Sequence, residues 1–283
     1  MGCLALESVS YWDYEQSESV EKNQDPTIKI ELNAVHKTFH TAQGSVAALD
    51  ETSLKINTNE IVCIVGPSGC GKSTLLNLVA GFIAPSAGSV RVDGVPVRGP
   101  GADRAVVFQQ DSIFPWLTVQ QNLAYGPRAR GLPNHEIQSI VDRLLALVGL
   151  TEYAELFPLQ LSGGMKKRVD LARAYANKPA VLLMDEPFGA LDVLTKEKMQ
   201  LELLRLWQEE ALTILFVTHD IEEALFIGDR VVVMTPRPAR VAEDIAVPFT
   251  RELDPRRKTT AAFQQLRQDL MDTLSQSEAE PAA

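Results

Sequence analysis

The sequence predicts an α/β fold: a largely parallel sheet that is interrupted by an all-helical insert. Continuous apolar runs of strand length, such as residues 60–66 and 213–219, alternate with segments of helical periodicity. This pattern is typical of buried parallel strands that are joined by helices. From about residue 111 to residue 177 the strand runs stop and helical patterns follow one another. A chain of 283 residues can bury such a core without metals or disulfides.

The first elements indicate an N-terminal antiparallel β-subdomain. Residues 28–39 alternate apolar and polar side chains, as a half-buried strand does, and residues 53–56 predict a second strand. Residues 88–97 predict a hairpin, because Asp93 and Gly94 form a pair that favours a tight turn between two strands.

The remaining elements continue the alternation of strands and helices. Inside the insert, residues 135–150 place apolar side chains on one face of a helix, and another helix follows Gly164. Outside the insert, the predicted strands are 60–66, 104–110, 180–186, 213–219 and 230–235, and the predicted helices are 72–82, 195–210 and 221–227.

The predicted domain spans residues 27–250, and both ends of the chain lie outside it. Residues 1–26 contain six acids and one Lys, a net charge of −5 out of −10 for the whole chain, and we expect a disordered tail. Within residues 251–283, apolar side chains at helical spacing between 255 and 274 predict a helix packed on its own domain. The closing "SQSEAEPAA" is expected to be disordered.

The composition excludes several classes of protein. The chain is acidic and has no stripe rich in Lys and Arg, which argues against binding to nucleic acid. Its three cysteines form no CxxC pair, so neither a disulfide framework nor a zinc site is indicated, and a reducing cytosol fits best. No apolar run approaches the roughly 18 residues of a membrane helix. The start of the sequence lacks the features of a signal peptide, and Leu6 stands where a lipidation motif requires Ser or Thr.

The stretch "GPSGCGKST" predicts a loop that binds the phosphates of a nucleotide. It fits G-x4-G-K-[ST] and stands between a predicted strand and a predicted helix. Backbone N–H groups of such a loop cradle phosphates, Lys72 reaches the β- and γ-phosphates, and the Ser73 hydroxyl ligates Mg²⁺. Alone, the loop leaves kinase, GTPase and ATPase open. The predicted binding residues are Gly66, Pro67, Ser68, Gly69, Cys70, Gly71, Lys72, Ser73 and Thr74.

Two carboxylates at the end of the strand 180–186 favour hydrolysis. Asp185 ends an apolar run, where a second contact to Mg²⁺ is wanted. Glu186, one residue further, is suited to polarise an attacking water as a general base. A kinase has little use for this group, because its nucleophile arrives with the substrate. The alternative for Glu186 is a solvated acid at a strand end.

Two further polar residues follow predicted strands of the same kind. His219 closes "ILFVTH" and Gln109 closes "AVVFQ". Because α/β sheets bind ligands at the carboxyl ends of their strands, His219 is placed to reach the γ-phosphate and Glu186. Gln109 is placed to touch Mg²⁺ or the attacking water. Taken out of this context, a lone His is more often structural.

In this order the motifs resemble those of the ATP-binding subunits of ABC transporters, over about residues 28–235. The matching pieces are "GPSGCGKST", "VFQQ" as the Q-loop, "LSGGM" as the signature, "VLLMDEP" as Walker B, "GALD" with Asp192 as the D-loop, and "THD" as the switch histidine. The resemblance implies a P-loop NTPase fold with a RecA-like core. It also implies ATP and Mg²⁺ as ligands, and catalysis by Glu186, His219 and Gln109. Phe39 matches the aromatic residue that stacks on adenine, the alternative being a buried strand aromatic.

The signature Ser162, Gly163 and Gly164 predicts a second anion-binding helix start. Ser162 is suited to cap a helix whose first N–H groups are free. The resemblance implies that two cassettes, as a homodimer or a paralogous heterodimer, pack head to tail. The signature of each then completes the ATP site of the other. Lys167 departs from the family, which usually has Gln there. It is expected either to oppose the helix dipole by a few tenths of a kcal/mol or to favour the partner's nucleotide.

The segment "DSIFPWLTVQQNLAYG" predicts an interface with a membrane subunit. Phe114, Trp116 and Leu117 form an apolar, aromatic cluster suited to a contact with a permease, although internal packing is an open alternative. This segment, "DEPFGALD" and "MTPRPARV" resemble importers of the nitrate, sulfonate and taurine class. The resemblance implies import of a small anion, including taurine, nitrate, alkanesulfonate or bicarbonate. The partners would be a permease and, indirectly, an extracytoplasmic solute-binding protein, at the cytoplasmic face of a bacterial inner membrane.

Two other functions remain open at this stage. One is an exporter or a force-transmitting cassette with a different membrane partner. The other is a soluble ABC ATPase, which should show a long coiled coil, a second cassette or a basic surface. The sequence does not name the transported solute.

Overall fold

A six-stranded sheet forms the centre of the molecule in the computed structural model, which describes residues 27–42, 44–110, 112–189, 191–210, 212–249 and 253–279. Its strand order is β10-β9-β3-β8-β7-β6. Neighbouring strands from β9 to β6 are parallel, and β10 is antiparallel to β9. The bounds are Ile61–Val65 (β3), Arg104–Val107 (β6), Val181–Asp185 (β7), Thr213–Val217 (β8), Arg230–Met234 (β9) and Val241–Ala246 (β10). Every residue of β3 and β8 is buried, as their continuous apolar runs predict.

A second, antiparallel sheet has the order β2-β1-β4-β5. It is built from β1 (Ile28–Thr41), β2 (Gly44–Asn57), β4 (Ala87–Val92) and β5 (Val95–Pro96). Asp93 and Gly94 form the predicted turn, with φ angles of 49° and 73°. Such left-handed angles at both central residues are those of a tight hairpin turn. The predicted antiparallel subdomain is therefore present.

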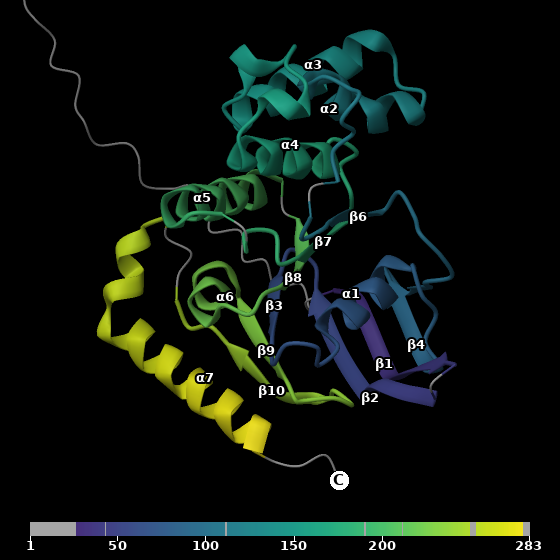
Figure 1. Cartoon of the computed structure of the whole chain (residues 1–283), viewed down its shortest axis with the longest axis vertical. Helices are drawn as coiled ribbons and strands as arrows, with labels where there is room; N and C mark the ends of the chain where they lie inside the picture. Colours follow the sequence, from purple (N-terminus) through teal and green to yellow (C-terminus); the bar gives the residue numbers. More distant parts are fainter. Residues whose placement is uncertain are drawn as a thin grey trace, which may run out of the picture.

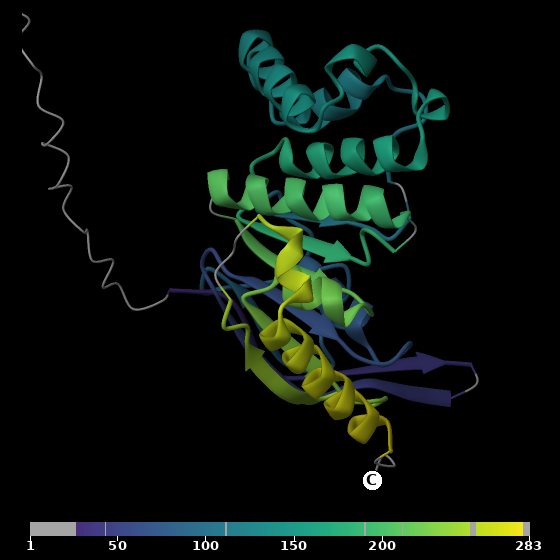
Figure 2. The ribbon, with the colours of Figure 1, turned by 90° about the vertical axis from the view of Figure 1, so that its left-hand side faces the viewer.

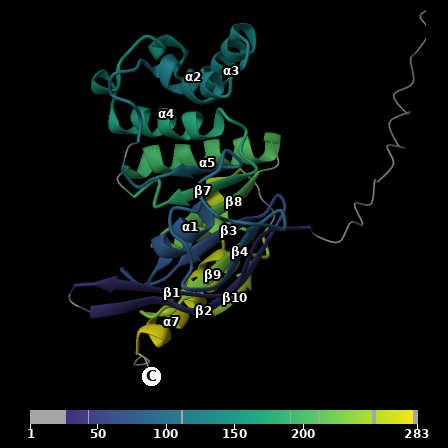
Figure 3. The same ribbon diagram turned by 90° about the vertical axis from the view of Figure 1, so that its right-hand side faces the viewer.

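Helix α1 (Lys72–Ala80) lies between the two sheets (Figures 1 and 3). Leu75 and Val79 of this helix share one buried apolar cluster with Leu32 of β1 and Ile64 of β3. The cluster fixes the start of α1, and the loop before it, at the carboxyl end of β3.

The helical insert occupies one end of the molecule in Figure 1. It contains α2 (Val119–Ala129), α3 (Asn134–Leu147), two short 3₁₀ helices (Thr151–Tyr153 and Pro158–Gln160) and α4 (Gly163–Tyr175). As predicted for residues 135–150, one face of α3 and its continuation is buried, including Ile137, Val141 and Leu144. Among the described residues from 112 to 177, every regular element is helical.

Three helices and a 3₁₀ turn pack on the other side of the six-stranded sheet. They are α5 (Val193–Glu210), α6 (Ile221–Ile227), the 3₁₀ helix Pro255–Thr259 and α7 (Ala261–Ala279). Figures 1 and 2 show α7 lying beside α6 and along β9 and β10. Phe263 and Leu270 are both 0% exposed, so α7 packs on its own domain as its apolar spacing predicts. No helix in the described part of the chain is both long and apolar enough to cross a membrane.

The structure differs from the sequence-based expectation at several element boundaries. Strand β10 was not expected, because its residues are charged and largely exposed and it joins the sheet through backbone pairing at an edge. Helix α7 continues to Ala279, within the segment that we expected to be disordered, because Gln, Ser, Glu and Ala allow a helix to continue. The expected tail 1–26 and residues 280–283 lie outside the described residues.

Candidate nucleotide-binding site

The loop from Gly66 to Gly71 requires glycine at its first and last positions. Gly66 has a φ of 158°, and a Cβ atom there would lie 2.8 Å from the carbonyl oxygen of Met234. Gly71 has a φ of 136°, and its Cβ would lie 3.0 Å from the carbonyl oxygen of Ala48. The neighbouring backbone therefore approaches each of these two glycines too closely for a side chain to fit. This close packing lets the backbone itself form the wall of the site.

Lys72 begins α1 and lies inside the loop. It is 6% exposed. Its Nζ donates to the carbonyl oxygens of Gly66 at 2.7 Å and Pro67 at 2.9 Å. Gly71, the residue before α1, provides no side-chain cap, and the first turn holds no acidic residue. The N–H groups and the positive end of this helix are thus available to an anion.

Ser73 and Asp185 come together across the carboxyl edge of the sheet. The Ser73 hydroxyl donates to Asp185 Oδ1 at 3.1 Å. Burial raises the pKa of the Asp185 carboxyl, the hydrogen bond from Ser73 and the charge of Lys72 lower it, and the charge of Glu186 raises it further. A hydroxyl and a carboxylate that converge in this way are oxygen ligands of the kind that Mg²⁺ prefers. The residues present therefore fit this ion.

One carboxylate oxygen of Glu186 contacts two other side chains. His219 Nδ1 lies 3.1 Å from Glu186 Oε2, and Gln109 Nε2 donates to the same atom at 3.3 Å. The sequence predicted that His219 reaches Glu186, and the structure places Gln109 on the same oxygen. Gln109 lies two residues beyond the end of β6, so it belongs to a loop and not to the predicted strand.

The backbone of Glu186 is held in an unusual conformation. Its φ is 43°, in the left-handed region that non-glycine residues rarely adopt. Its N–H donates to the carbonyl oxygen of Val217 at 2.9 Å, which ties the end of β7 to the end of β8. The Glu186 side chain is 22% exposed. Strain of this kind is characteristic of functional positions, and here it directs the carboxylate toward the strand end that carries His219.

Ser162 caps α4 in the predicted manner. Its Oγ accepts a hydrogen bond from the Met165 N–H at 3.3 Å, and its carbonyl oxygen accepts one from the Lys166 N–H at 2.9 Å. A Cβ atom on Gly163 would meet nothing within 4 Å, so the helix start is open on this side. A Cβ atom on Gly164 would lie 2.7 Å from Thr195 Cγ2, because the start of α5 packs against it.

Asp192 lies directly before α5. Its Oδ1 accepts a hydrogen bond from the Thr195 N–H at 3.1 Å. Hydrogen bonds from Thr195 hold the pKa of the Asp192 carboxyl below its usual value. The side chain therefore caps the start of α5.

Phe39 is 37% exposed on β1, which excludes the alternative of a buried strand aromatic. Lys37 Nζ lies 5.0 Å from the centre of its ring. A flat aromatic surface of this kind can stack against a base. Stacking on adenine remains a prediction.

Phe114, Trp116 and Leu117 lie between β6 and α2. The Phe114 ring centre lies 5.5 Å from that of Trp116 and 4.6 Å from that of Tyr125. Trp116 is 69% exposed and Tyr125 is 52% exposed, whereas Phe114 and Leu117 are half-buried. Phe114 and Tyr125 also line a pocket of about 260 Å³. Internal packing explains Phe114 and Leu117 in part, but it does not explain Trp116.

Comparisons with known proteins agree with this geometry. A family model described as ABC transporter matches residues 49–189. An uncharacterized ABC transporter ATP-binding protein from Methanocaldococcus jannaschii is 42% identical over 260 residues, 92% of this chain and 96% of the relative. This chain belongs to the ATP-binding proteins of ABC transporters. The expected P-loop NTPase fold is confirmed.

Other relatives of this ABC cassette carry more specific names. A nitrate import ATP-binding protein from Synechococcus elongatus is 47% identical over 252 residues, 87% of this chain and 91% of the relative. A taurine import ATP-binding protein from Chromobacterium violaceum is 52% identical over 204 residues, 72% of this chain and 78% of the relative. Among solved structures, a dimeric ATP-binding cassette in a post-hydrolysis state with ADP and Pi has a TM-score of 0.69 and 32% identity. That match covers 78% of this chain and 100% of the solved chain.

Lys167 of the cassette does not behave as either sequence-based hypothesis expected. It is 4% exposed, which is incompatible with a role at a partner's nucleotide. Its Nζ donates to the carbonyl oxygens of Phe108 at 2.5 Å and Gln109 at 3.3 Å, and lies 3.8 Å from Asp170 Oδ2. The Lys167 ammonium group therefore binds the Q-loop of its own chain. The negative charge of Asp170 offsets the unfavourable interaction of this ammonium group with the helix dipole. The sequence could not indicate this, because the contact joins segments that are far apart along the chain.

A group of buried polar residues that the sequence did not predict lies behind His219. Thr218 and Glu223 are 1% and 3% exposed, and the Thr218 hydroxyl donates to Glu223 Oε2 at 2.5 Å. The available signal was the spacing of Asp220 and Glu223, which is that of a capping pair at a helix start. Asp220 Oδ1 indeed accepts a hydrogen bond from the Glu223 N–H at 3.2 Å.

Proposed function

We propose that this chain is the ATP-hydrolysing subunit of an importer for a small anion such as nitrate, taurine, an alkanesulfonate or bicarbonate. The observation that carries the hydrolytic part is the convergence of His219 and Gln109 on one oxygen of Glu186. The import part is supported by relatives named for nitrate and taurine import at 47% and 52% identity. The alternatives of an exporter and a soluble ATPase have no such support.

The loop Gly66–Thr74 binds the phosphates of ATP in this proposal. The backbone N–H groups and the positive end of α1 face the phosphate oxygens. The Lys72 ammonium, which is held by two loop carbonyls, turns its donors to the β- and γ-phosphates. Ser73, Asp185 and Gln109 would hold Mg²⁺, which when bound supplies positive charge against the phosphates. Phe39 stacks on the adenine.

Glu186 acts as the general base. Its carboxylate accepts a proton from a water molecule, whose oxygen forms a bond to the γ-phosphorus while the bond from that phosphorus to the β–γ bridging oxygen breaks. The products are ADP and inorganic phosphate. His219 binds Glu186 Oε2 and fixes the direction of the carboxylate, and Gln109 does the same from the other side of the site.

The signature acts on the nucleotide of a second cassette. Ser162, Gly163 and Gly164 present an open helix start, which stabilises the negative charge that develops on a partner's γ-phosphate. ATP then holds a homodimer or a paralogous heterodimer together, and hydrolysis loosens it. The dimeric solved cassette with ADP and Pi supports this assembly. Asp192, directly before α5, belongs to the same interface.

The cassette works at the cytoplasmic face of the membrane as a peripheral subunit, with residues 27–250 as the cassette and residues 251–283 as a C-terminal addition that contains α7. Exposed Trp116, with Phe114 and Leu117 behind it, contacts a permease. An extracytoplasmic solute-binding protein delivers the anion to that permease.

The test combines hydrolysis with transport. Glu186→Gln should retain ATP binding and form an ATP-dependent dimer, while release of phosphate falls at least about 100-fold, as expected for loss of a general base. Unimpaired phosphate release by this variant would refute Glu186 as the base. A strain without the gene should lose uptake of one labelled anion among nitrate, taurine, alkanesulfonate, bicarbonate and cyanate. Unchanged uptake of all five would refute the importer class, and recovery of the native complex without a permease would refute the partner.

A further inference from the structure

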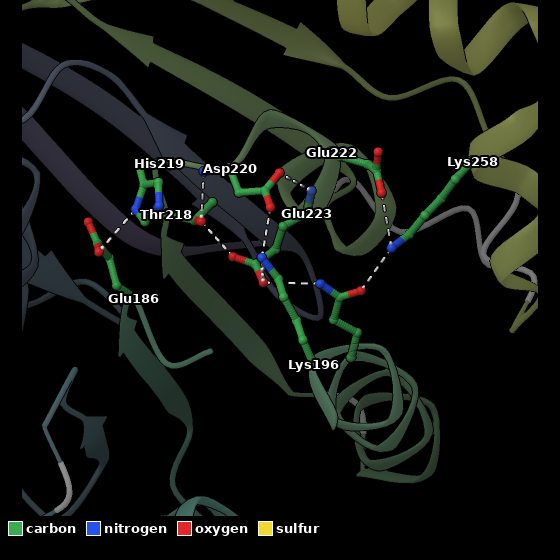
Figure 4. A network of polar contacts seen from close by, with 9 residues as sticks. Glu186, Lys196, Thr218, His219, Asp220, Glu222, Glu223 and Lys258 are labelled. Carbon is green, nitrogen blue, oxygen red and sulfur yellow. Dashed lines mark hydrogen bonds and ion pairs between the residues drawn. The ribbon is translucent and has the colours of Figure 1, made fainter. Parts of the chain in front are cut away.

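A chain of polar contacts runs from Thr218, the residue before His219, to the C-terminal segment (Figure 4). His219 itself contacts Glu186, and the chain leads from Thr218 to Glu223. It then passes through Gln200 of α5 to Lys258, which lies in the 3₁₀ helix before α7. The proposed hydrolysis does not use the part of this network beyond His219.

Thr218 connects the network to both sides of His219. Its N–H donates to the carbonyl oxygen of Ile64 on β3, and its hydroxyl donates to Glu223 Oε2. The same hydroxyl accepts a hydrogen bond from the Asp220 N–H at 3.1 Å. The residue before His219 and the residue after it are therefore tied to one hydroxyl group, whose direction is set by Glu223.

Glu223 is a buried carboxylate, and its environment fixes it in place. Besides the Thr218 hydroxyl, it accepts a hydrogen bond from Gln200 Nε2 at 3.0 Å and lies 3.2 Å from Lys196 Nζ. Lys196 also binds Asp220 at 2.7 Å. Such fully paired buried networks are stiff, because each lost contact leaves a polar atom without water or a partner.

Lys258 sets the orientation of the amide that completes this network. Lys258 Nζ donates to Gln200 Oε1 at 3.2 Å, and Gln200 is 1% exposed. The ammonium group requires the amide oxygen on its side, so the amide nitrogen must face Glu223. Lys258 is held there by Glu222 at 3.4 Å and by the Phe226 ring, whose centre lies 4.6 Å from Nζ. Without the ammonium group, only the Glu223 carboxylate still orients the Gln200 amide, so the amide is held less firmly.

We propose that Lys258 is a positioning residue for His219, acting through Gln200, Glu223 and Thr218. The C-terminal segment thereby sets how His219 meets Glu186. The inference rests on the proposed function, since it takes Glu186 and His219 as the hydrolytic pair. Because a catalytic group must be held within a fraction of an ångström, a relaxed network lowers the rate of hydrolysis without changing the phosphate loop that binds ATP.

The first test compares Lys258→Met with Arg256→Met in the full-length chain. Arg256 lies in the same 3₁₀ helix and is 88% exposed, with an ion pair to Asp254 outside the network. Lys258→Met should lower kcat about fivefold with KM for ATP unchanged, as expected when a group that orients a catalytic residue is lost. Lys258→Arg should restore most of kcat, and Arg256→Met should match the unmodified protein. An unchanged kcat, a parallel rise in KM, or an equal loss in Arg256→Met would overturn the proposal.

The second test reads His219 directly, without hydrolysis. The chain has four histidines, so ¹⁵N-labelled imidazole groups give few NMR signals, and His219→Gln assigns the one of interest. Lys258→Met should shift the His219 signals and leave those of His36, His40 and His135 in place. His219 signals that stay unchanged would overturn the proposal even if kcat falls. Absence of ATP hydrolysis in the unmodified protein would instead refute the proposed function, and the NMR result would still decide whether Lys258 acts on His219.

The third test asks whether the effect travels through Thr218. Thr218→Val keeps the shape of the side chain and removes the hydroxyl that links Glu223 to the His219 turn. In this background Lys258→Met should cause no further loss of kcat, because the connection is already broken. If the two substitutions lower kcat by independent factors that multiply, Lys258 does not act through Thr218. That result would overturn the proposed route.

Discussion

Lys167 Nζ lies 2.5 Å from the carbonyl oxygen of Phe108, across the gap between α4 and the Q-loop. The same ammonium group donates to the carbonyl oxygen of Gln109, whose side chain contacts Glu186. Three residues further along α4, Asp170 Oδ1 accepts a hydrogen bond from the Ser112 hydroxyl at 2.7 Å. The helix that begins with the signature therefore contacts the Q-loop at Phe108 and Gln109 and the following segment at Ser112.

This contact predicts that Lys167 supports the Q-loop and not the partner's nucleotide. Lys167→Met removes all donors but keeps a long side chain, so two carbonyl oxygens lose their donor and Asp170 keeps only Arg173 as a cation. We expect a loss of about 1–3 kcal/mol in the free energy of unfolding, the cost of leaving buried polar groups unpaired. We also expect a weaker response of hydrolysis to Mg²⁺, because Gln109 is less ordered. Urea unfolding and Mg²⁺ titration of the ATPase rate measure the two effects.

Lys166→Met is the matched control, since Lys166 is the preceding lysine on the same helix and is more exposed. Lys167→Gln, which carries the residue usual in the family, should recover part of the stability because the amide can still donate to one carbonyl. If Lys167→Met behaves like Lys166→Met in both measurements, the contact with the Q-loop is without energetic value.

The sequence predicted the local parts of the site and missed the contacts that depend on distant segments. The phosphate loop, Asp185, Glu186 and His219 each follow a buried strand, and a parallel sheet brings such strand ends to one edge. Burial of Lys167 depends on the position of the Q-loop, which lies more than fifty residues earlier in the chain. Exposure of Phe39 likewise depends on how far β1 extends beyond the core, and alternation along one strand does not determine that.

The same distinction explains the errors in the fold. Strand β10 pairs at the edge of the sheet through its backbone, so its charged side chains carry no apolar pattern. Helix α7 continues past Leu274, the last residue of its apolar stripe, because residues 275–279 include no Gly or Pro. The strands β3 and β8 were assigned correctly because every side chain in them is apolar or buried, which leaves few alternatives.

We expect the Asp185 carboxylate to lower the stability of the nucleotide-free fold although hydrolysis requires it. Burial raises the pKa of its carboxyl above the usual value, so the folded state binds this proton more tightly than the unfolded chain does. Stability from this group is thus fully present below the unfolded pKa and is lost as pH rises through the folded pKa. At neutral pH the charged carboxylate weakens the nucleotide-free fold. Asp185→Asn should therefore raise Tm without nucleotide by about 1–3 °C at pH 7, the scale of small stability changes in domains of this size.

The same variant should lose Mg²⁺-dependent hydrolysis, because an amide is a poorer ligand for a hard cation than a carboxylate. Thermal unfolding at pH 7 and pH 4 checks the sign: the gain over the unmodified protein should shrink at the lower pH, where Asp185 is more protonated. If Asp185→Asn is less stable than the unmodified protein at pH 7, the charged carboxylate does not destabilise the fold. If the variant is equally active, Asp185 is not a ligand of Mg²⁺.

The open helix start at Ser162 leads us to expect that hydrolysis requires two chains. Ser162→Arg places a bulky cation at an open helix start while Glu186 stays intact. Alone, this variant should bind ATP but hydrolyse it slowly, because each site faces a blocked signature. Glu186→Gln alone should also be inactive. In a dimer that contains one chain of each kind, the intact Glu186 of the first faces the intact signature of the second, and one competent site is restored.

An equal mixture of the two inactive variants should therefore recover hydrolysis. With random pairing, half of the dimers are mixed and half of their sites are competent, so about a quarter of the original rate returns if the sites act independently. Ser139→Arg, which makes the same change at an exposed position of α3, serves as the control for added charge and should stay active alone. A mixture that remains as inactive as its components would contradict a signature that acts across a homodimer. Recovery would in turn exclude a signature that serves the site of its own chain, since neither variant has both parts intact.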